Sequence, residues 1–226
     1  MALIGQAVMI NWSNVPVEHR DEYYEWHDRE HMAGRLTVPG FKRGRRHIAL
    51  DANRDIFNLY EVEDLAVLTS GPYTALTQNP TEATRRVGKV IVDAIRALAN
   101  VKFTTGVGVG GFVHTLRFDA IAGRGDTLTV SLAKTELPRL ATRPGVVAVH
   151  LCVADHAAST VVTTERKGRP TEVPNWSVII EGTSMDAASA AGESLRDDML
   201  AGLGASGPAA RGTYVLQRLV MRHDVA

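Results

Sequence analysis

The sequence predicts an α+β fold in which two similar halves form one barrel. Three observations predict it: strand and helix patterns follow the order β-α-β-β-α-β, the same order returns in the second half, and the turns Pro39-Gly40 and Pro144-Gly145 lie 105 residues apart. This order is that of a ferredoxin-like unit. One such sheet leaves a face bare, so we expect two ferredoxin-like β-α-β-β-α-β repeats to close as an intrachain pseudo-dimeric α+β barrel.

The first repeat is expected to cover residues 1–109. Asn14 and Pro16 are typical of a helix start, and Gly34 with Pro39-Gly40 is typical of its end. The patterns predict strands at 6–12, 41–50, 56–62 and 101–109, and helices at 16–35, 65–76 and 81–99.

The second repeat is expected to cover residues 110–226. A polar segment at 155–174 is longer than the matching turn of the first half and is expected to be a loop. The remaining patterns predict strands at 112–118, 146–153, 176–182 and 214–221, and helices at 126–141 and 185–203.

A glycine-rich segment at 106–111 joins the two repeats. It has some likeness to a phosphate loop, but it lies within a strand pattern and lacks the Lys-Ser/Thr that follows such a loop. Strand bending or close backbone packing is the favoured interpretation.

Composition limits the classes of function. The 226 residues carry 25 basic and 25 acidic side chains, so no basic excess points to nucleic acid. Cys152 is the only cysteine, which excludes an internal disulfide and a Cys-rich metal site. No apolar run is long enough to cross a membrane, and the first residues do not resemble a secretion signal. We therefore expect a cytoplasmic protein with no nucleic-acid or membrane partner.

The first helix carries the residues best suited to chemistry. Tyr24, His27 and His31 follow at helical spacing with Glu30 alongside, which predicts an acid–base cluster on one helix face. Histidine titrates near neutrality, and a neighbouring carboxylate fixes its tautomer and raises its pKa. The alternative is a solvated helix face with ordinary side-chain contacts.

The same residues match H-x-x-E-H, the inverted zinc-protease motif. Two histidines four residues apart can bind one zinc ion, but the site would need a third protein ligand that the motif does not supply. We therefore expect no metal and no other cofactor.

The segment from Trp26 to His31, followed by Val38-Pro39-Gly40-Phe41 and the Arg-bearing residues 42–46, resembles the dimeric α+β barrel superfamily, in particular its EthD-like members. That resemblance covers residues 6–105, while the second half fits by topology and by Pro144-Gly145. It implies a small-molecule cavity between sheet and helices. Relatives include cofactor-free monooxygenases, isomerases, polyketide cyclases and haem enzymes. The family histidine corresponds to His31, whereas His27 stands where the family often has tyrosine.

Arg43, Arg45 and His47 share one face of a predicted strand, where they are candidates for binding a substrate anion or enolate; surface ion pairing is the alternative. Trp12 is a further candidate for substrate contact, although tryptophans more often belong to the core. His114 and His150 lie on apolar strands and are expected to be core histidines.

These patterns predict a cofactor-independent acid–base enzyme of the lyase, isomerase or cyclase type that acts on a small hydrophobic oxygenated molecule. His31 would transfer the proton, and Arg43 or Arg45 would stabilise an oxyanion. The alternatives are a cofactor-free monooxygenase and a non-catalytic binding or structural protein. The second half carries Lys134 and Glu136 but no histidine on its first helix, so one site per chain is expected. Beyond the substrate, the partner expected is a second copy of the chain in a homodimer.

Overall fold

The computed structural model describes residues 2–225 and folds them into a closed barrel of antiparallel strands. Around the barrel the strands follow the order β1-β3-β2-β8-β5-β7-β6-β4. Their bounds are β1 Ala7–Asn14, β2 Phe41–Ala52, β3 Ile56–Val62, β4 Val92–Gly106, β5 Phe112–Ala120, β6 Val146–Ala154, β7 Trp176–Gly182 and β8 Ala205–Met221.

Each half of the chain contributes four neighbouring strands. The first half gives β4-β1-β3-β2 and the second gives β8-β5-β7-β6, which is the same arrangement. The halves join where β2 pairs with β8 and where β4 pairs with β6. The second strand of each half thus pairs with the fourth strand of the other. This confirms the predicted pseudo-dimeric α+β barrel.

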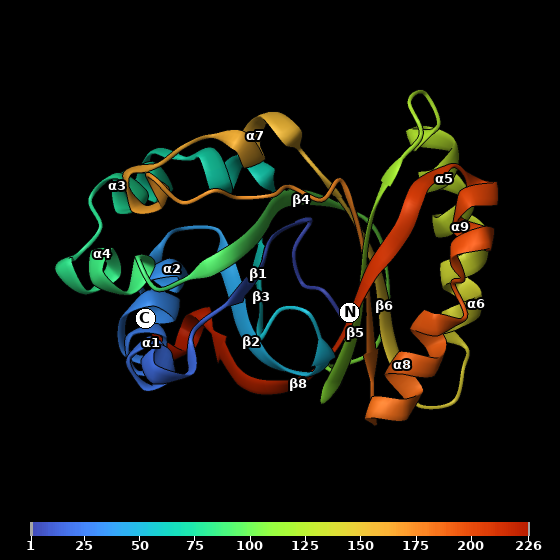
Figure 1. Cartoon of the computed structure of the whole chain (residues 1–226), viewed down its shortest axis with the longest axis horizontal. Helices are drawn as coiled ribbons and strands as arrows, with labels where there is room; N and C mark the ends of the chain where they lie inside the picture. The colour runs from blue at the N-terminus through green and yellow to red at the C-terminus, as the bar shows by residue number, and fades with distance from the viewer. Residues whose placement is uncertain (1, 226) are drawn as a thin grey trace.

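Helices cover the outside of the barrel in two groups (Figure 1). The first-half helices lie on the left of the view and the second-half helices α5, α6, α8 and α9 lie on the right. Their bounds are α1 Arg20–Trp26, α2 Met32–Thr37, α3 Gly71–Gln78, α4 Glu82–Gly88, α5 Gly125–Ser131, α6 Leu137–Ala141, α7 His156–Thr160, α8 Met185–Glu193 and α9 Asp197–Leu203.

The first helix of each half contains a π turn. One turn spans His27–His31, between α1 and α2, and the other spans Leu132–Glu136, between α5 and α6. These two turns lie 105 residues apart, which is also the spacing of the two Pro-Gly turns. The halves therefore match down to this irregularity of their helices.

The barrel interior combines an apolar core with a buried ionic network. Arg43 donates from Nε to Glu61 over 2.6 Å, and Arg45 donates from one guanidinium nitrogen to Glu181 over 2.7 Å. The other terminal nitrogen of Arg45 lies 3.1 Å from Glu61, and His150 Nε2 lies 3.1 Å from Glu181. The network joins the two halves of the barrel at its centre.

The predicted helix at 81–99 is wrong, and so are the bounds of the predicted strand at 101–109, because β4 covers Val92–Gly106. Residues 81–99 do not form one helix: α4 ends at Gly88 and β4 begins at Val92. Ile95 then points into the barrel and Leu98 toward the helices, so the two side chains do not share a helical face. The physical reason is tertiary pairing, because β4 fills the gap between β1 and β6 and closes the barrel.

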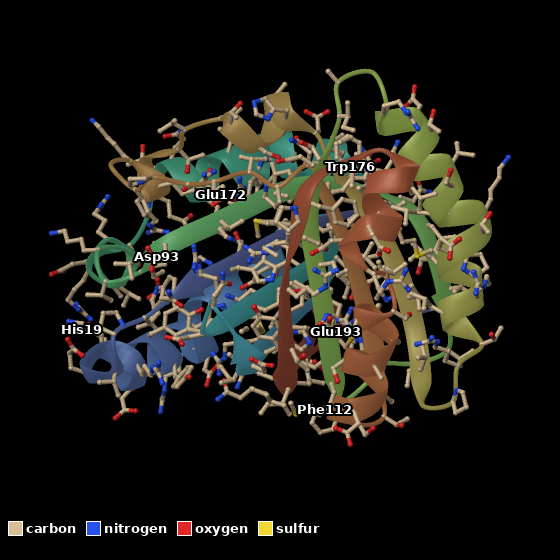
Figure 2. All side chains as sticks on the ribbon, turned by 45° about the vertical axis from the view of Figure 1, so that its right-hand side comes forward. His19, Asp93, Phe112, Glu172, Trp176 and Glu193 are labelled. Atoms are coloured by element: carbon tan, nitrogen blue, oxygen red, sulfur yellow. The ribbon has the colours of Figure 1, made fainter. Side chains whose placement is uncertain are left out.

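The polar segment 155–174, here named the strap, crosses from the second half to the first. In Figure 1 it runs in orange from the top of the barrel, through α7, to the region of α3 and α4. Glu172 bonds to β4 through its backbone, accepting from Arg96 N (2.9 Å) and donating to Ala94 O (3.1 Å). Figure 2 places Glu172 near Asp93 at the start of β4. The strap therefore covers a surface of the first half.

No helix within residues 2–225 is both long enough and apolar enough to span a membrane.

Candidate functional site

A cavity of about 80 Å³ lies between the helix side of the first-half sheet and the strap, and we call it the first-half cavity. Its floor is formed by β1, β3 and β4, and its walls by α1, the π turn, α2, α3 and α4. Side chains lining it include Met9, Asn11, Trp12, Tyr23, Trp26, His27, His31, Arg35, Asn58, Tyr60, Tyr73, Thr84, Arg96, Thr163, Glu165, Arg166 and Arg169.

The π turn sets two imidazoles side by side at the cavity wall. The rings of His27 and His31 stack with centroids 5.5 Å apart, and the Trp26 ring lies 4.2 Å from His31. Trp26 is fixed by its indole N–H, which donates to Thr84 Oγ1 over 3.1 Å. A π turn is wider than an α turn and is frequent at functional sites.

The tautomer of His27 follows from its two partners. Arg46 lies 3.1 Å from His27 Nδ1, and arginine can only donate, so Nδ1 accepts. The ring proton of the neutral imidazole is then on Nε2, which lies 3.0 Å from the Tyr60 hydroxyl oxygen. His27 therefore donates to Tyr60, and the hydroxyl proton of Tyr60 remains available for the cavity.

Burial keeps both of these groups uncharged. Desolvation, followed by the nearby His31 and Arg46, holds the pKa of His27 well below its usual value. Desolvation likewise raises the pKa of Tyr60, which is 1% exposed. Tyr60 is thus a hydrogen-bond donor that keeps its proton.

His31 is the imidazole that the protein leaves free. Its side chain is 14% exposed, and neither ring nitrogen makes a hydrogen bond within the described chain; the carboxylate of Glu165 lies 4.0 Å from Nδ1. Desolvation, then the positive charges of Arg35 and Arg169, holds its pKa well below the usual value. His31 is therefore a neutral base with a lone pair to offer.

The cavity floor is a polar row across three strands. Asn58 on β3 pairs in register with Asn11 on β1, which pairs with Arg96 on β4. Asn58 donates from Nδ2 to the Tyr23 hydroxyl over 3.1 Å, while its buried Oδ1 has no partner in residues 2–225. The floor thus presents an unused acceptor beside the histidines.

The rest of the wall is strongly basic. Arg35, Arg96, Arg166 and Arg169 line the cavity, and Glu165 is its one carboxylate among the described residues. Burial lowers the pKa of Arg166 to about 10, and neighbouring arginines act in the same direction. For Arg35 burial is again the largest influence and lowers the pKa, but the charge and hydrogen bond of Glu165 together with the nearby Tyr73 and Tyr60 raise it overall.

The structure separates the predicted helix cluster. Its two histidines line the cavity, but Tyr24 and Glu30 do not. Tyr24 stacks on the Arg46 guanidinium at 4.8 Å, and Glu30 accepts hydrogen bonds from Thr81 and Thr84 at the start of α4. The π turn rotates Glu30 away from the imidazoles, so Arg46, and not a carboxylate, fixes the tautomer of His27.

The other candidates lie mostly inside the barrel. Arg43, Arg45 and His47 point inward from β2, on the face opposite Arg46, and do not line the cavity; the two arginines belong to the ionic network described above. His47 stacks on Phe57 and has its Nδ1 3.2 Å from the Phe57 carbonyl oxygen. Neither arginine is therefore placed to take the predicted oxyanion role in the first-half cavity.

Trp12 borders the cavity from the end of β1, with its ring stacked on Phe57 at 5.1 Å. His114 is buried against Thr213, 2.8 Å from its hydroxyl. His150 is buried in the barrel network.

Sequence reasoning missed the residues that come from outside the first helix. Arg46 and Tyr60 lie on neighbouring strands, and Arg166 and Arg169 lie on the strap. Alternation along β2 places Arg46 on the helix side, and that signal was available. No local signal shows that the strap reaches the other half.

No group of three or more potential metal ligands occurs in the part of the chain described here. The equivalent π turn of the second half, Leu132–Glu136, packs on an apolar core. The titratable cluster is therefore confined to one half.

No family model and no curated protein matches this chain. Solved structures do match along nearly all of it. An anthrone oxidase-like protein has a TM-score of 0.70 at 13% identity, covering 100% of this chain and 98% of that one. A putative monooxygenase from Lactobacillus acidophilus has a TM-score of 0.58 at 11% identity, covering 96% of each chain.

A haem-binding protein from Thermus thermophilus has a TM-score of 0.52 at 13% identity, covering 93% of this chain and 91% of that one. At these identities the likeness shows the fold alone. The dimeric α+β barrel fold is therefore shown, while membership of the EthD-like group stays a prediction.

Proposed function

We propose that the protein is an acid–base enzyme that removes a proton from a carbon next to a carbonyl group of a small oxygenated molecule. A neutral His31 without a hydrogen-bond partner in residues 2–225, in one cavity with a Tyr60 hydroxyl free to donate, carries this proposal. Many lyase, isomerase and cyclase reactions of carbonyl compounds begin with such a proton transfer.

His31 is assigned the role of base. Its lone pair takes the proton, the substrate carbon keeps the electron pair, and the carbonyl becomes an enolate. The imidazolium then returns the proton to the same or another atom of the intermediate. The lowered pKa of His31 keeps it unprotonated at neutral pH and makes the imidazolium a good acid for the second step.

Tyr60 is assigned to the enolate oxygen. Arg46 orients His27, and His27 donates to Tyr60, so the tyrosine O–H is left free to donate to a ligand in the cavity. A donor fixed in place before the reaction stabilises developing negative charge without reorganisation. Tyr24 supports the arrangement by stacking on Arg46.

A cofactor-free monooxygenase is the second candidate, supported by the fold shared with an anthrone oxidase-like protein. Its first step would be the same proton removal, after which the carbanion reacts with O₂. A small-molecule-binding protein without catalysis would use the same cavity and lack the proton transfer.

The cavity residues do not fit haem. Both ring nitrogens of His27 are engaged. A metal-ligating histidine usually donates its other N–H to a partner, and His31 has none among the described residues. No step is therefore assigned to an iron centre.

Solvent exchange tests the proposal. Small ketones, β-dicarbonyls and oxo acids are incubated with the protein in D₂O, and deuterium uptake at carbon is followed by NMR. We expect His31→Gln to lose about 10² to 10⁴ of the accelerated rate. Lys134→Ala, on the exposed surface of the matching helix, is the control and should keep the full rate. Deuterium exchange that persists in His31→Gln would show that His31 is not the base. Consumption of O₂ during the reaction would favour the monooxygenase.

A further inference from the structure

We propose that the substrate carries a carboxylate, which takes the place of the Glu165 carboxylate on Arg35 beside His31. This deepens the proposed function, on which it rests, by assigning the chemical class of the substrate. It also assigns Glu165 as a competitor built into the strap.

The Glu165 carboxylate is seated on a buried arginine. Arg35, 5% exposed, donates from one terminal nitrogen to Oε1 over 2.6 Å and also to Oε2. Oε1 is in turn 4.0 Å from His31 Nδ1. Glu165 comes from a segment 130 residues away in sequence, so the strap brings a carboxylate to the base. The structure thereby shows that this position accepts a carboxylate.

The surrounding groups favour an anion over a neutral ligand. Arg96, Arg166 and Arg169 line the same cavity, and Glu165 is the one acid within residues 2–225 that faces them there. Buried polar atoms without a partner in the described chain include Nε of Arg35 and Nε of Arg169, which can only donate. A ligand rich in acceptor oxygens would satisfy these donors.

The small size of the cavity favours a substrate that displaces Glu165. A cavity of about 150 Å³ accommodates benzene. The first-half cavity is about 80 Å³ with Glu165 in place, so a substrate of more than a few heavy atoms needs the space that this side chain fills. A substrate carboxylate that displaces Glu165 would gain Arg35 and the space together. The reacting carbon would then lie next to His31.

Two probes of nearly equal shape separate charge from size. Acetoacetate carries a carboxylate and a ketone, whereas acetylacetone replaces the carboxylate by a neutral acetyl group. Their dissociation constants are measured by calorimetry at constant ionic strength with the wild-type protein and with Glu165→Gln. Glu172→Gln is the matched control: it removes the same charge from the same strap, but Glu172 is exposed and its contacts with β4 use the backbone.

We expect the wild-type protein to bind acetoacetate about tenfold or more tightly than acetylacetone, because hydrogen bonds to a charged group are stronger than those to a neutral one. Glu165→Gln should strengthen acetoacetate binding by about tenfold, since the competing charge is gone. Glu172→Gln should change it less than about twofold, and neither variant should change acetylacetone binding by more.

The wild-type protein alone can overturn the proposal. It does so if the two probes bind with equal affinity or if neither of them binds. Equal effects of Glu165→Gln and Glu172→Gln would overturn the competitor role. Neither result depends on turnover. If His31→Gln loses the exchange activity and the two probes bind equally, the proposed function is supported and the proposal of a substrate carboxylate is rejected.

Discussion

Three side chains in series decide what Tyr60 can do. Because Arg46 can only donate, it places the His27 proton on Nε2, and that proton leaves the tyrosine hydroxyl with a hydrogen to give. The helix histidines were predictable from spacing. Tyr60 was not predictable, because a tyrosine in a buried strand is expected to belong to the hydrophobic core unless its hydrogen-bond partner is known.

Tyr60→Phe should lower kcat by about 10² to 10³, the loss typical of one oxyanion donor. It also leaves the His27 N–H buried without a partner, so the free energy of unfolding should fall by about 1–3 kcal/mol. Tyr214→Phe, which removes a buried hydroxyl inside the barrel, is the control for activity. Steady-state rates and urea unfolding would check both. An unchanged kcat in Tyr60→Phe would contradict the donor role.

The π turn shows why helical spacing alone misplaces residues. An α-helix would put Glu30 beside His27 and His31, as the helical spacing predicts. The wider turn keeps the two rings stacked but directs Glu30 to Thr81 and Thr84. Likewise, residues 92–99 have an apolar pattern compatible with a helix, and pairing between β1 and β6 makes them a strand. Local patterns carry neither kind of information.

The glycine-rich linker at 106–111 joins the two halves, and close backbone packing is one interpretation of its glycines. Two substitutions in this linker test that interpretation. Gly110 donates to Glu181 over 2.8 Å, and an added Cβ would lie 2.7 Å from the backbone nitrogen of Gly182. Gly110→Ala should lower the free energy of unfolding by about 2–4 kcal/mol. Gly111→Ala meets nothing within 4 Å and should cost less than about 1 kcal/mol. Similar urea midpoints for the two variants would reject this interpretation.

At the level of the whole molecule, the repeated element order was enough to predict a two-half barrel. The strand pairs that close that barrel could not be predicted, because the β2–β8 and β4–β6 pairings join residues far apart in sequence. The same is true of the buried ions. The guanidinium of Arg45 lies between Glu61 of the first half and Glu181 of the second. No residue near Arg45 in the sequence indicates which face of β2 points into the barrel.

Buried neutral histidines should make the protein acid-sensitive. Burial and Arg45 lower the pKa of His47 to about 3, and burial and Arg211 lower that of His114 to about 4; the pKa values of His27 and His31 shift in the same direction. Below about pH 6.5 these histidines are protonated in the unfolded chain but remain neutral in the folded chain. The free energy of unfolding therefore falls as pH falls. Each histidine contributes up to about 1.4 kcal/mol per pH unit.

Urea unfolding between about pH 7.5 and pH 5 at constant ionic strength measures this slope. His47→Phe should reduce this slope by up to about 1.4 kcal/mol per pH unit, because the unfolded variant has one fewer histidine to protonate. A free energy of unfolding that stays constant or rises over this range would contradict the buried, uncharged state of these rings.

The charge state of His31 tests the central claim most directly, because it needs no substrate. Nitrogen-15 NMR of histidine-labelled protein reports whether each imidazole is protonated, and His31→Gln assigns the signal. Since the pKa of His31 lies well below the usual 6.5, its ring should be uncharged at about pH 6. A His31 that takes up its proton near the usual value would contradict a neutral base held ready in the first-half cavity.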